Sequence, residues 1–357
     1  FVREIFMNNP KIAIIKSDFH DQHSSAWGHV WVEYCDQQKI DYSLIDWRSK
    51  DAFRKLIDHD IILWHYSHYS NDEMVFAKNI LSALKSAGCI VFPDQADSQH
   101  FDDKVAQSYF IRALGLDSPE NYPLHSLNAV DEWIKETKEF PVVAKLRTGS
   151  GSSNVKLIND KNELKKYAKQ MFGNGINSAP STAFKLKSNL ISTKSLDEFL
   201  KRIKRIPEFL FSRTQAKSLP KEKGYVYLQE YIPNVNYDLK IAVVRDKLSF
   251  VARGTRPGEF RASGGGTLFY DKTLVTKAII DSAFKAFDAL GSECTGLDMI
   301  TDPRSNMPAI LEVSYGFSHT AQLGAGGYFD RSGSWISKPF NPPLEVLKNL
   351  IKDFRRK

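Results

Sequence analysis

The chain has 357 residues, of which 42% are hydrophobic and 25% are charged. These values are ordinary for a globular protein and exclude collagen-like and low-complexity chains. The formal net charge is +7, but residues 161–223 alone hold 15 Lys and Arg against 5 Asp and Glu, a local +10 that leaves −3 for the rest. The basic excess therefore favours one local anionic partner over a protein coated with nucleic acid.

No apolar run reaches the ~18–20 residues that a membrane span needs, so none is predicted. Cys35, Cys89 and Cys294 are far apart and form no CxxC, which favours reduced thiols in a cytoplasmic protein. The start of the chain lacks the layout of a signal peptide, and Met7 is a candidate natural start.

Residues 11–97 alternate strand and helix patterns, which predicts a parallel sheet with helices on its faces. Polar and aromatic residues follow two of the strands, at 17–20 and 65–69. They are consistent with a substrate pocket at the carboxyl ends of the strands, and equally with surface loops. No GxGxxG follows the first strand, so a dinucleotide site is not expected. The predicted strands are 11–16, 41–46, 60–65 and 89–92, and the predicted helices are 28–38, 52–56 and 72–87.

In the remainder of the chain, the predicted helices and strands do not alternate regularly. A basic stretch rich in Gly, Asn, Ser and Pro covers 172–223 and includes one helical pattern at 196–206. The other predicted helices are 102–114, 130–137, 161–171, 278–290 and 344–354, and the other strands are 140–146, 154–158, 225–231, 237–244 and 248–253.

A lysine strand followed by a small-residue loop suggests phosphate binding. Lys145 ends the run Pro-Val-Val-Ala-Lys, where its stem can lie along a sheet and its ammonium can reach an anion. The loop after it can point backbone N–H groups at a polyphosphate. A plain hairpin turn is the alternative interpretation of the same residues. No Gly-Lys-Ser/Thr follows, so it is not a Walker loop. The loop residues are Gly149, Ser150, Gly151, Ser152 and Ser153.

Two further segments carry weaker signals. The extended run Leu-Gln-Glu-Tyr-Ile-Pro at 228–233 could pair its edge amides with an adenine, or could be an ordinary strand end. Downstream, Arg253, Arg256 and Arg261 surround Pro-Gly-Glu-Phe and precede three consecutive glycines. Such arginines suit a transferring phosphoryl group, and a solvated basic loop is the alternative.

A pair of carboxylates near the C-terminus is the most informative feature. Asp298 and Glu312 each lie in a short β-branched run, and a turn at 302–308 joins the two runs into a predicted hairpin. Alternation would set Asp298 against Leu297 and Met299, and Glu312 against Leu311 and Val313. Two acids at one level of a sheet suit Mg²⁺ bound to phosphates.

The order of these elements resembles the ATP-grasp superfamily, nearest to its ribosomal-protein glutamate ligase and glutathione synthetase-like branch. The resemblance covers residues 98 to about 320, and the unit before it matches the family's N-terminal domain. It implies an α/β fold, α+β in the nucleotide domain, in which a Rossmann-like parallel sheet precedes a two-lobed ATP-grasp fold. The implied parts are an N-terminal domain (1–97), linker helices (98–140), a lid lobe (141–232, with the basic insert 172–223), a catalytic lobe (233–325) and a C-terminal tail and helix (326–357).

The resemblance also implies roles for single residues. Lys104 and Lys145 would contact phosphates, residues 149–153 would cover them, and Asp238 would meet the ribose. Asp298 and Glu312 would hold Mg²⁺, with Mn²⁺ as a substitute. Ser314 stands where the family usually has Asn, which puts a second metal in doubt. The implied set for ATP is completed by Gln229, Glu230, Tyr231, Ile232 and Lys240, and the γ-phosphate and acyl-phosphate would face Arg253, Arg256 or Arg261.

The implied function is an ATP-dependent carboxylate-amine ligase that forms an amide through an acyl-phosphate and releases ADP and phosphate. An ATP-binding pseudo-enzyme and a phosphotransferase on the same fold are the alternatives. The basic insert favours an anionic or polymeric carboxylate substrate, unless it serves ATP alone. Nucleic acid is not an expected partner, because the insert has few aromatic side chains for base stacking. A homodimer is compatible with the sequence.

Overall fold

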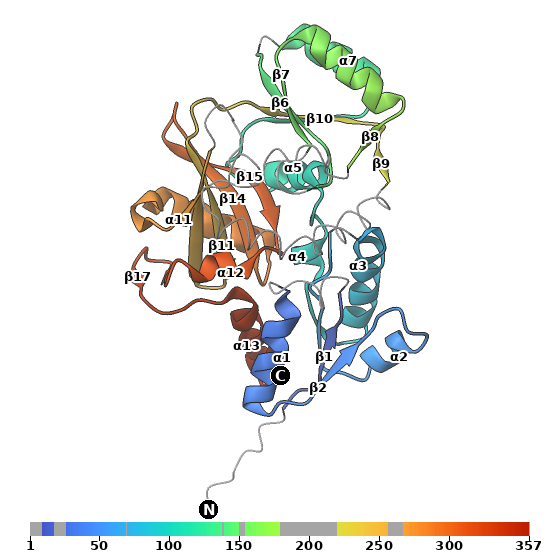
Figure 1. Cartoon of the computed structure of the whole chain (residues 1–357), viewed down its shortest axis with the longest axis vertical. Helices are drawn as coiled ribbons and strands as arrows, with labels where there is room; N and C mark the ends of the chain where they lie inside the picture. The colour runs from blue at the N-terminus through green and yellow to red at the C-terminus, as the bar shows by residue number, and fades with distance from the viewer. Residues whose placement is uncertain are drawn as a thin grey trace, which may run out of the picture.

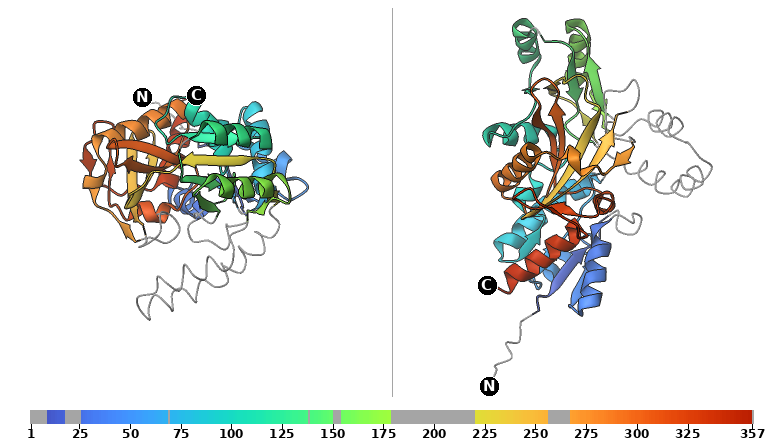
Figure 2. Two further views of the ribbon diagram at one scale, coloured as in Figure 1. Left: turned by 90° about the horizontal axis from the view of Figure 1, so that it is seen from above. Right: turned by 90° about the vertical axis from the view of Figure 1, so that its left-hand side faces the viewer.

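The computed structural model describes residues 9–17, 26–68, 70–137, 139–149, 154–178, 220–255 and 267–356. Within these residues, three larger β-sheets follow one another along the molecule (Figure 1). The side view places the N-terminal sheet at one end and a four-stranded sheet, here called the lid sheet, at the other (Figure 2). In the part of the chain that the structure describes, no helix combines the length and the apolar character needed to cross a membrane.

The N-terminal unit is a parallel sheet flanked by helices, as the alternating pattern predicts. Its strands pair in the order β2-β1-β3-β4, all of them parallel. Three of the four strands are continuous apolar runs, which suits a sheet buried on both faces. The elements are β1 (Ile12–Ile15), α1 (Trp27–Gln38), β2 (Tyr42–Ile45), α2 (Ala52–Leu56), β3 (Ile61–Leu63), α3 (Asn71–Ser86), β4 (Ile90–Phe92) and α4 (Gln95–Ser98).

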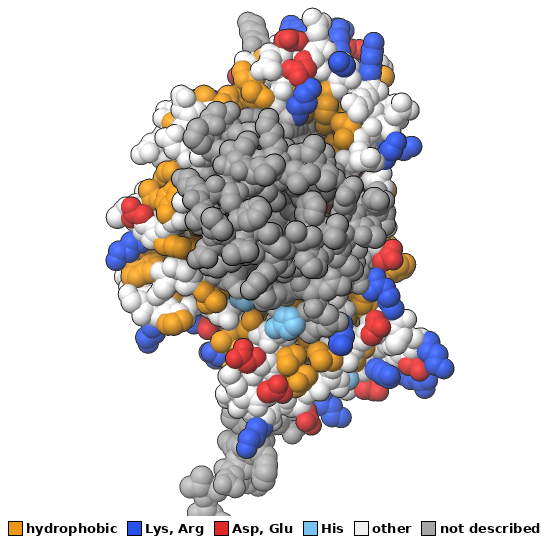
Figure 3. Space-filling model, in the orientation of Figure 1, with side chains coloured by type: hydrophobic (Ala, Val, Ile, Leu, Met, Phe, Trp, Pro, Cys, Tyr) orange, Lys and Arg blue, Asp and Glu red, His pale blue; other side chains and the backbone are white. Residues whose placement is uncertain are grey.

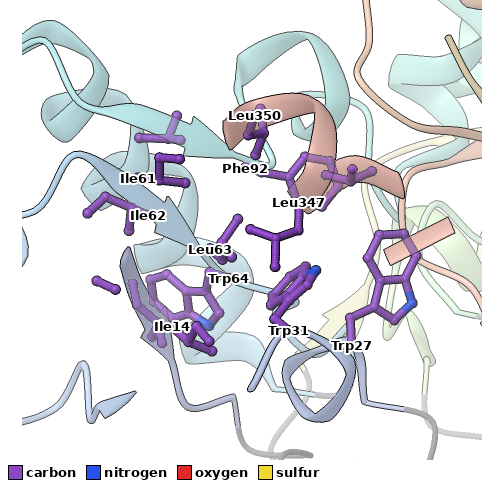
Figure 4. Close-up of a cluster of buried hydrophobic side chains, with 14 of the residues drawn as sticks. Ile14, Trp27, Trp31, Ile61, Ile62, Leu63, Trp64, Phe92, Leu347 and Leu350 are labelled. Atoms are coloured by element: carbon purple, nitrogen blue, oxygen red, sulfur yellow. The ribbon is translucent and has the colours of Figure 1, made fainter. Parts of the chain in front are cut away.

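The last helix of the chain, α13 (Pro342–Phe354), returns to this unit and packs on α1. Figure 4 shows its Leu347 and Leu350 beside Phe92 and Trp31 in one buried cluster. The indole Nε1 of Trp31 donates to the carbonyl of Pro343 at 2.9 Å. The C-terminal helix therefore completes the core of the N-terminal sheet.

The lid sheet has the order β5-β10-β6-β7, with α6 and α7 packed together on it. Strand β5 was not predicted, because Pro119 and Pro123 are typical of a loop; β5 is an edge strand, where a proline such as Pro123 is tolerated. Lys and Arg side chains lie among acidic ones at the top of Figure 3, where α7 lies. Most of the basic insert 172–223, namely residues 179–219, is outside the described residues. The elements are β5 (Asn121–Leu124), α6 (Leu127–Glu136), β6 (Val142–Lys145), β7 (Val155–Ile158), α7 (Lys161–Phe172) and β10 (Val226–Glu230), with a separate pair β8 (Ile176–Asn177) and β9 (Lys221–Glu222).

The third sheet, here called the C-terminal sheet, is antiparallel and covered on one face by α11. Buried side chains of α11, such as Ala283 and Phe287, pack against Leu239 and Leu297 of the sheet. Its path runs β15-β14-β11-β12-β16-β17, with β13 paired to β12. The elements are β11 (Tyr237–Val244), β12 (Lys247–Gly254), β13 (Leu268–Phe269), η1 (Lys272–Leu274), α11 (Lys277–Leu290), β14 (Thr295–Asp302), β15 (Met307–Ser314), α12 (His319–Leu323), β16 (Tyr328–Phe329) and β17 (Trp335–Ile336).

The carboxylate hairpin is present as β14 and β15, but strict alternation fails at one residue. Met299 pairs with Ile310, whereas Asp298 pairs with Glu312, so Leu311 is an extra residue that forms a β-bulge. Leu311 packs with Ile300 on the face of Asp298, and not with Val313 in the core beneath α11 as alternation predicts. Regular pairing would have set Glu312 opposite Leu297 on the core face. The bulge therefore places the two carboxylates side by side.

Helix α5 (Lys104–Ala113) lies between the lid sheet and the C-terminal sheet. It begins at Lys104, because Asp102 has a left-handed φ of 51° and Asp103 caps the helix by accepting from the Ala106 N–H at 2.9 Å. The buried Gln107 joins the helix to β15, donating to the Val313 carbonyl at 2.8 Å and accepting from the Val313 N–H at 3.2 Å. These two bonds fix the start of α5 to Val313, the residue that follows Glu312 in β15.

Candidate active site

Charged side chains line up across three strands on the face of the C-terminal sheet opposite α11. Lys240 of β11 lies directly opposite Asp298 of β14, which in turn lies opposite Glu312 of β15. Lys240 Nζ is 2.7 Å from Asp298 Oδ1, and Arg253 Nη2 is 3.2 Å from Asp298 Oδ2. Burial alone would raise the pKa of Asp298, but the two cations hold it well below its usual range. Asp298 is therefore a charged carboxylate at any ordinary pH.

Arg253 is also bound by a second carboxylate. Its Nε and Nη2 donate to the two oxygens of Asp238, each at 2.7 Å. Burial disfavours the guanidinium, but Asp298 and Asp238 outweigh it and raise the pKa of Arg253. This fork fixes the guanidinium in one plane beside the carboxylate pair. Since both oxygens of Asp238 are engaged here, its contact with a ribose stays a prediction.

Lys104 connects the carboxylate hairpin to the start of the glycine loop. Its Nζ lies 3.5 Å from Glu312 Oε1 and donates to the Gly149 carbonyl at 2.7 Å. Burial works against the charge, yet Glu312 and Asp102 outweigh it, so the pKa of Lys104 is raised. The Lys104 ammonium thus lies between a carboxylate and a neutral carbonyl, and a phosphate oxygen can replace the carbonyl as its acceptor.

Lys145 projects from the end of β6 and is bound through a side-chain amide. Its Nζ donates to Gln229 Oε1 of the neighbouring strand β10 at 2.5 Å. Burial lowers the pKa of Lys145 to about 8, with the positive charge of Lys104 acting in the same direction and Glu312 opposing it. Lys104 and Lys145, the two lysines that the sequence predicts for phosphate binding, thus lie close enough for their charges to interact.

The base of the glycine loop is anchored to the residues that precede α5. The Gly149 N–H donates to Asp102 Oδ1 at 3.0 Å, and burial raises the pKa of Asp102 to about 7. Arg147 bridges Asp103, at 3.0 Å, and Glu222 of β9, at 3.3 Å. The lid sheet is therefore tied to α5 through both backbone and charged groups at the point where the loop starts.

The predicted adenine segment lies where the lid sheet meets the hairpin. Glu230 forms an ion pair of 2.6 Å with Arg304 in the β14–β15 turn, and Ile232 packs on Ile300 and Ala309. Tyr231 follows β10 directly. These contacts join the segment to the strands that carry Asp298 and Glu312, and adenine binding itself stays a prediction.

Ser314, two residues beyond Glu312, donates its hydroxyl to the Gly316 carbonyl at 2.7 Å. The chain then enters an aromatic cluster at the carboxyl end of β3, where the rings of Trp27 and His65 stack at 4.9 Å and Trp27 Nε1 donates to the Phe317 carbonyl at 3.0 Å. The polar end of the N-terminal sheet is thus adjacent to the end of β15.

Several predicted site residues lie outside the described residues, so the structure places none of them. They are Ser150, Gly151, Ser152 and Ser153 of the glycine loop, Arg256 and Arg261 of the arginine loop, and the predicted helix 196–206.

The donor set fits a hard divalent cation held together with phosphate oxygens. Asp298 and Glu312 are adjacent carboxylates, oxygen donors of the kind that Mg²⁺ takes. Among the described residues, no three His, Cys, Asp or Glu side chains gather into a metal site. The protein alone would thus leave most of the coordination sphere to water and nucleotide oxygens, which is the usual manner of Mg²⁺ binding beside phosphates.

Replacing Gly296 by alanine is expected to disturb this pair, because a Cβ there would lie 2.6 Å from Phe317 Cδ1 and 2.9 Å from the Ser314 carbonyl oxygen. The β14–β15 pairing would have to shift, lowering stability by about 1–3 kcal/mol. Thermal melts would measure the loss. Gly254→Ala is the matched control, since its Cβ would meet only ordinary contacts at 3.5 Å and beyond. Equal melting temperatures for both variants would contradict the prediction.

Solved structures share the fold over nearly the whole of this chain. A D-alanine–D-alanine ligase from Bacillus anthracis is 16% identical, with 97% of this chain and 98% of that chain covered and a TM-score of 0.59. The RimK domain protein ATP-grasp from Sphaerobacter thermophilus is 14% identical, with 96% and 99% covered and a TM-score of 0.53. An L-amino acid ligase from Bacillus licheniformis is 14% identical, with 96% and 75% covered and a TM-score of 0.55. The chain therefore has the ATP-grasp fold, which confirms the predicted fold class.

At these identities the likeness shows the fold alone. No family model matches the sequence, and no curated protein matches it. The B. anthracis ligase also has a structure complexed with ATP, which is 15% identical with a TM-score of 0.56.

Four residues that organise the site carry no predictive signal in the sequence or only a weak one. Asp102 and Arg147 anchor the glycine loop, Gln107 fixes α5, and Asn121 bonds to Gln229. Each is a common polar residue with no local motif. Only the acidic pair before Lys104, at a helix start, offered a sequence signal.

Proposed function

We propose that this protein is an ATP-dependent carboxylate-amine ligase. The observation that carries the proposal is the convergence of Lys104 and Arg253 on the adjacent carboxylates Asp298 and Glu312, with Lys145 close enough to interact with their charge, within an ATP-grasp fold. Cations arranged around a hard-metal site suit a polyphosphate whose transferring group gains charge. That the similar solved structures include several ligases supports the same reading.

In the proposed reaction, ATP lies between the lid sheet and the C-terminal sheet. A substrate carboxylate oxygen attacks the γ-phosphorus, and the bond to the β–γ bridging oxygen breaks, which gives ADP and an acyl-phosphate. An amine nitrogen then attacks the acyl carbon, phosphate leaves, and the nitrogen loses a proton to give an amide. The protein acts mainly by positioning and by neutralising charge.

The residues divide this work. Lys104 would exchange the Gly149 carbonyl for a phosphate oxygen, and Lys145 would offer the donors that Gln229 leaves unused. Arg253, fixed by Asp238, would face the charge that develops on the transferring group. Asp298 and Glu312 would hold Mg²⁺, which when bound supplies charge neutralisation for the phosphates.

A turnover screen tests the proposal. ADP release would be measured with MgCl₂ and ATP while amino acids, uronic acids and acidic peptides are paired with pooled amines. The expected result is ADP release that requires both a carboxylate and an amine. The product is expected to have the summed mass of the two substrates less one water. ADP release with a stable phosphorylated product and no need for an amine would replace the ligase by a phosphotransferase. MgATP binding without turnover on any pair would favour a binding module.

The pKa of Lys145, lowered to about 8 by burial, predicts a pH dependence. Below about pH 8 the free protein holds the ammonium that attracts phosphate, and above it the charge is lost. The kcat/KM for ATP is therefore expected to fall about tenfold per pH unit above roughly pH 8. Steady-state kinetics between pH 6.5 and 9.5 would measure it. Lys145→Arg stays charged throughout, so an identical alkaline limb in this variant would contradict the assignment.

A further inference from the structure

Asn121 lies on β5, the edge strand of the lid sheet, and bonds to Gln229 of β10. We infer that Asn121 is a positioning residue that sets which end of the Gln229 amide faces Lys145, and thereby directs the Lys145 ammonium toward the nucleotide phosphates. The inference rests on the proposed function, because it assigns a means of placing one of the phosphate-binding groups.

The orientation of the Asn121 amide is fixed by groups that cannot be reversed. Its Nδ2 donates to the backbone carbonyl of Pro119 at 2.8 Å and lies 3.3 Å from Ser118 Oγ. A carbonyl can only accept, so the NH₂ end of Asn121 must point to Pro119 and its Oδ1 must point to the neighbouring strand. Asn121 is buried, with 7% of the residue surface exposed, so water does not compete strongly for these bonds.

The oxygen of Asn121 in turn fixes Gln229. It accepts from Gln229 Nε2 at 2.9 Å and from the hydroxyl of Tyr227 at 2.7 Å. With its NH₂ end engaged, Gln229 can present only its oxygen to Lys145, where the bond is 2.5 Å long. A directional chain of hydrogen bonds thus runs from the Pro119 carbonyl to the Lys145 ammonium.

The strand register makes this chain possible. Asn121 lies opposite Gln229, and Tyr227 lies opposite Lys145, in the two antiparallel pairs that β10 makes with β5 and β6. Directly opposed residues share one face of a sheet, and their diagonal neighbours remain within reach of long side chains. The four polar groups therefore form one row on the same face of the lid sheet.

The charges around Lys145 explain why the orientation matters. Glu312 of β15 and Asp298 of β14 attract its ammonium, while Lys104 of α5 repels it. A Gln229 amide turned to offer its NH₂ group would add a second repulsion and leave the ammonium to move toward Glu312. Losing a hydrogen bond to a charged group typically weakens an interaction about 10- to 100-fold.

The test compares two ligands by calorimetry and NMR, the non-hydrolysable analogue AMP-PNP with Mg²⁺ and adenosine, which has no phosphate. Asn121→Leu is expected to weaken AMP-PNP binding about 10- to 100-fold and to leave adenosine binding within about twofold. Tyr227→Phe is the matched control, because it removes the other bond to Asn121 Oδ1 and spares the chain.

A thermal melt precedes binding, and Asn121→Val, with a β-branched side chain suited to a strand, replaces the leucine variant if that one does not fold. Equal losses for AMP-PNP and adenosine would overturn the inference, because they indicate a general structural role. Unchanged AMP-PNP binding in the leucine variant would overturn it too, while leaving the proposed ligase intact. Failure of the unaltered protein to bind AMP-PNP would instead overturn the proposed function itself.

Discussion

Replacing Glu312 by glutamine is expected to lower ADP formation about 10³-fold while leaving the protein folded. Glutamine keeps the size of the side chain but removes the negative charge that lies beside Asp298 and within 3.5 Å of Lys104 Nζ. In the proposed reaction the charge holds the cation that neutralises the phosphates, so the loss falls on the transition state. ADP release with a saturating substrate pair would measure it, and a thermal melt would confirm folding.

The matched control for this variant is Glu345→Gln. Glu345 also forms a part-buried ion pair with a lysine, Lys247, at 2.6 Å, but it lies on α13, which packs on the N-terminal unit. It is expected to keep full activity. A Glu312→Gln variant as active as the Glu345→Gln control would remove the carboxylate hairpin from the proposed site.

Replacing Gln107 by leucine is expected to destabilise the protein by about 2–5 kcal/mol and to impair ADP formation together. The buried amide of Gln107 satisfies the Val313 N–H, the Val313 carbonyl and the His100 carbonyl, and leucine can bond to none of them. Helix α5 would lose its link to β15, and Lys104 its placement beside Glu312. Melting temperature and KM for ATP would be measured on the same sample.

Tyr109→Phe, two residues along the same helix, is the control for this prediction. Its hydroxyl contacts His125 at the surface, and half of the side chain is exposed, so the change is expected to stay within about 0.5 kcal/mol. A leucine variant at 107 that melts at the same temperature as Tyr109→Phe would show that the bonds to Val313 do not hold α5 in place.

Local patterns in the sequence predict much of the fold. The N-terminal strands are runs of β-branched residues bounded by turns, and the predicted strand 237–244 matches β11 at both ends. Strand β5 was missed because Pro123 opposes a strand in general, although an edge position tolerates it. The failure at Leu311 has a different cause, since a bulge depends on the pairing with the partner strand and the sequence of its own strand carries no signal of it.

The site could be predicted only where chemistry is carried by charge. Asp298, Glu312 and Lys145 stand out because a charged residue inside an apolar strand is unusual. Gln107 and Asn121 do not stand out, and their partners Val313 and Gln229 lie 206 and 108 residues further along the chain. Bonds over such separations are fixed by tertiary packing, so no local sequence window contains them.

The bulge at Leu311 divides the hairpin into two independently anchored parts. Toward the turn, Thr301 and Asp302 pair with Pro308 and Met307 in one register, while Asp298 and Gly296 pair in another that also meets β11. A change in the length of the turn is thus absorbed in the outer part, before it reaches the carboxylates. An insertion at the hairpin tip is accordingly expected to spare the carboxylates while it displaces Arg304 from its ion pair with Glu230.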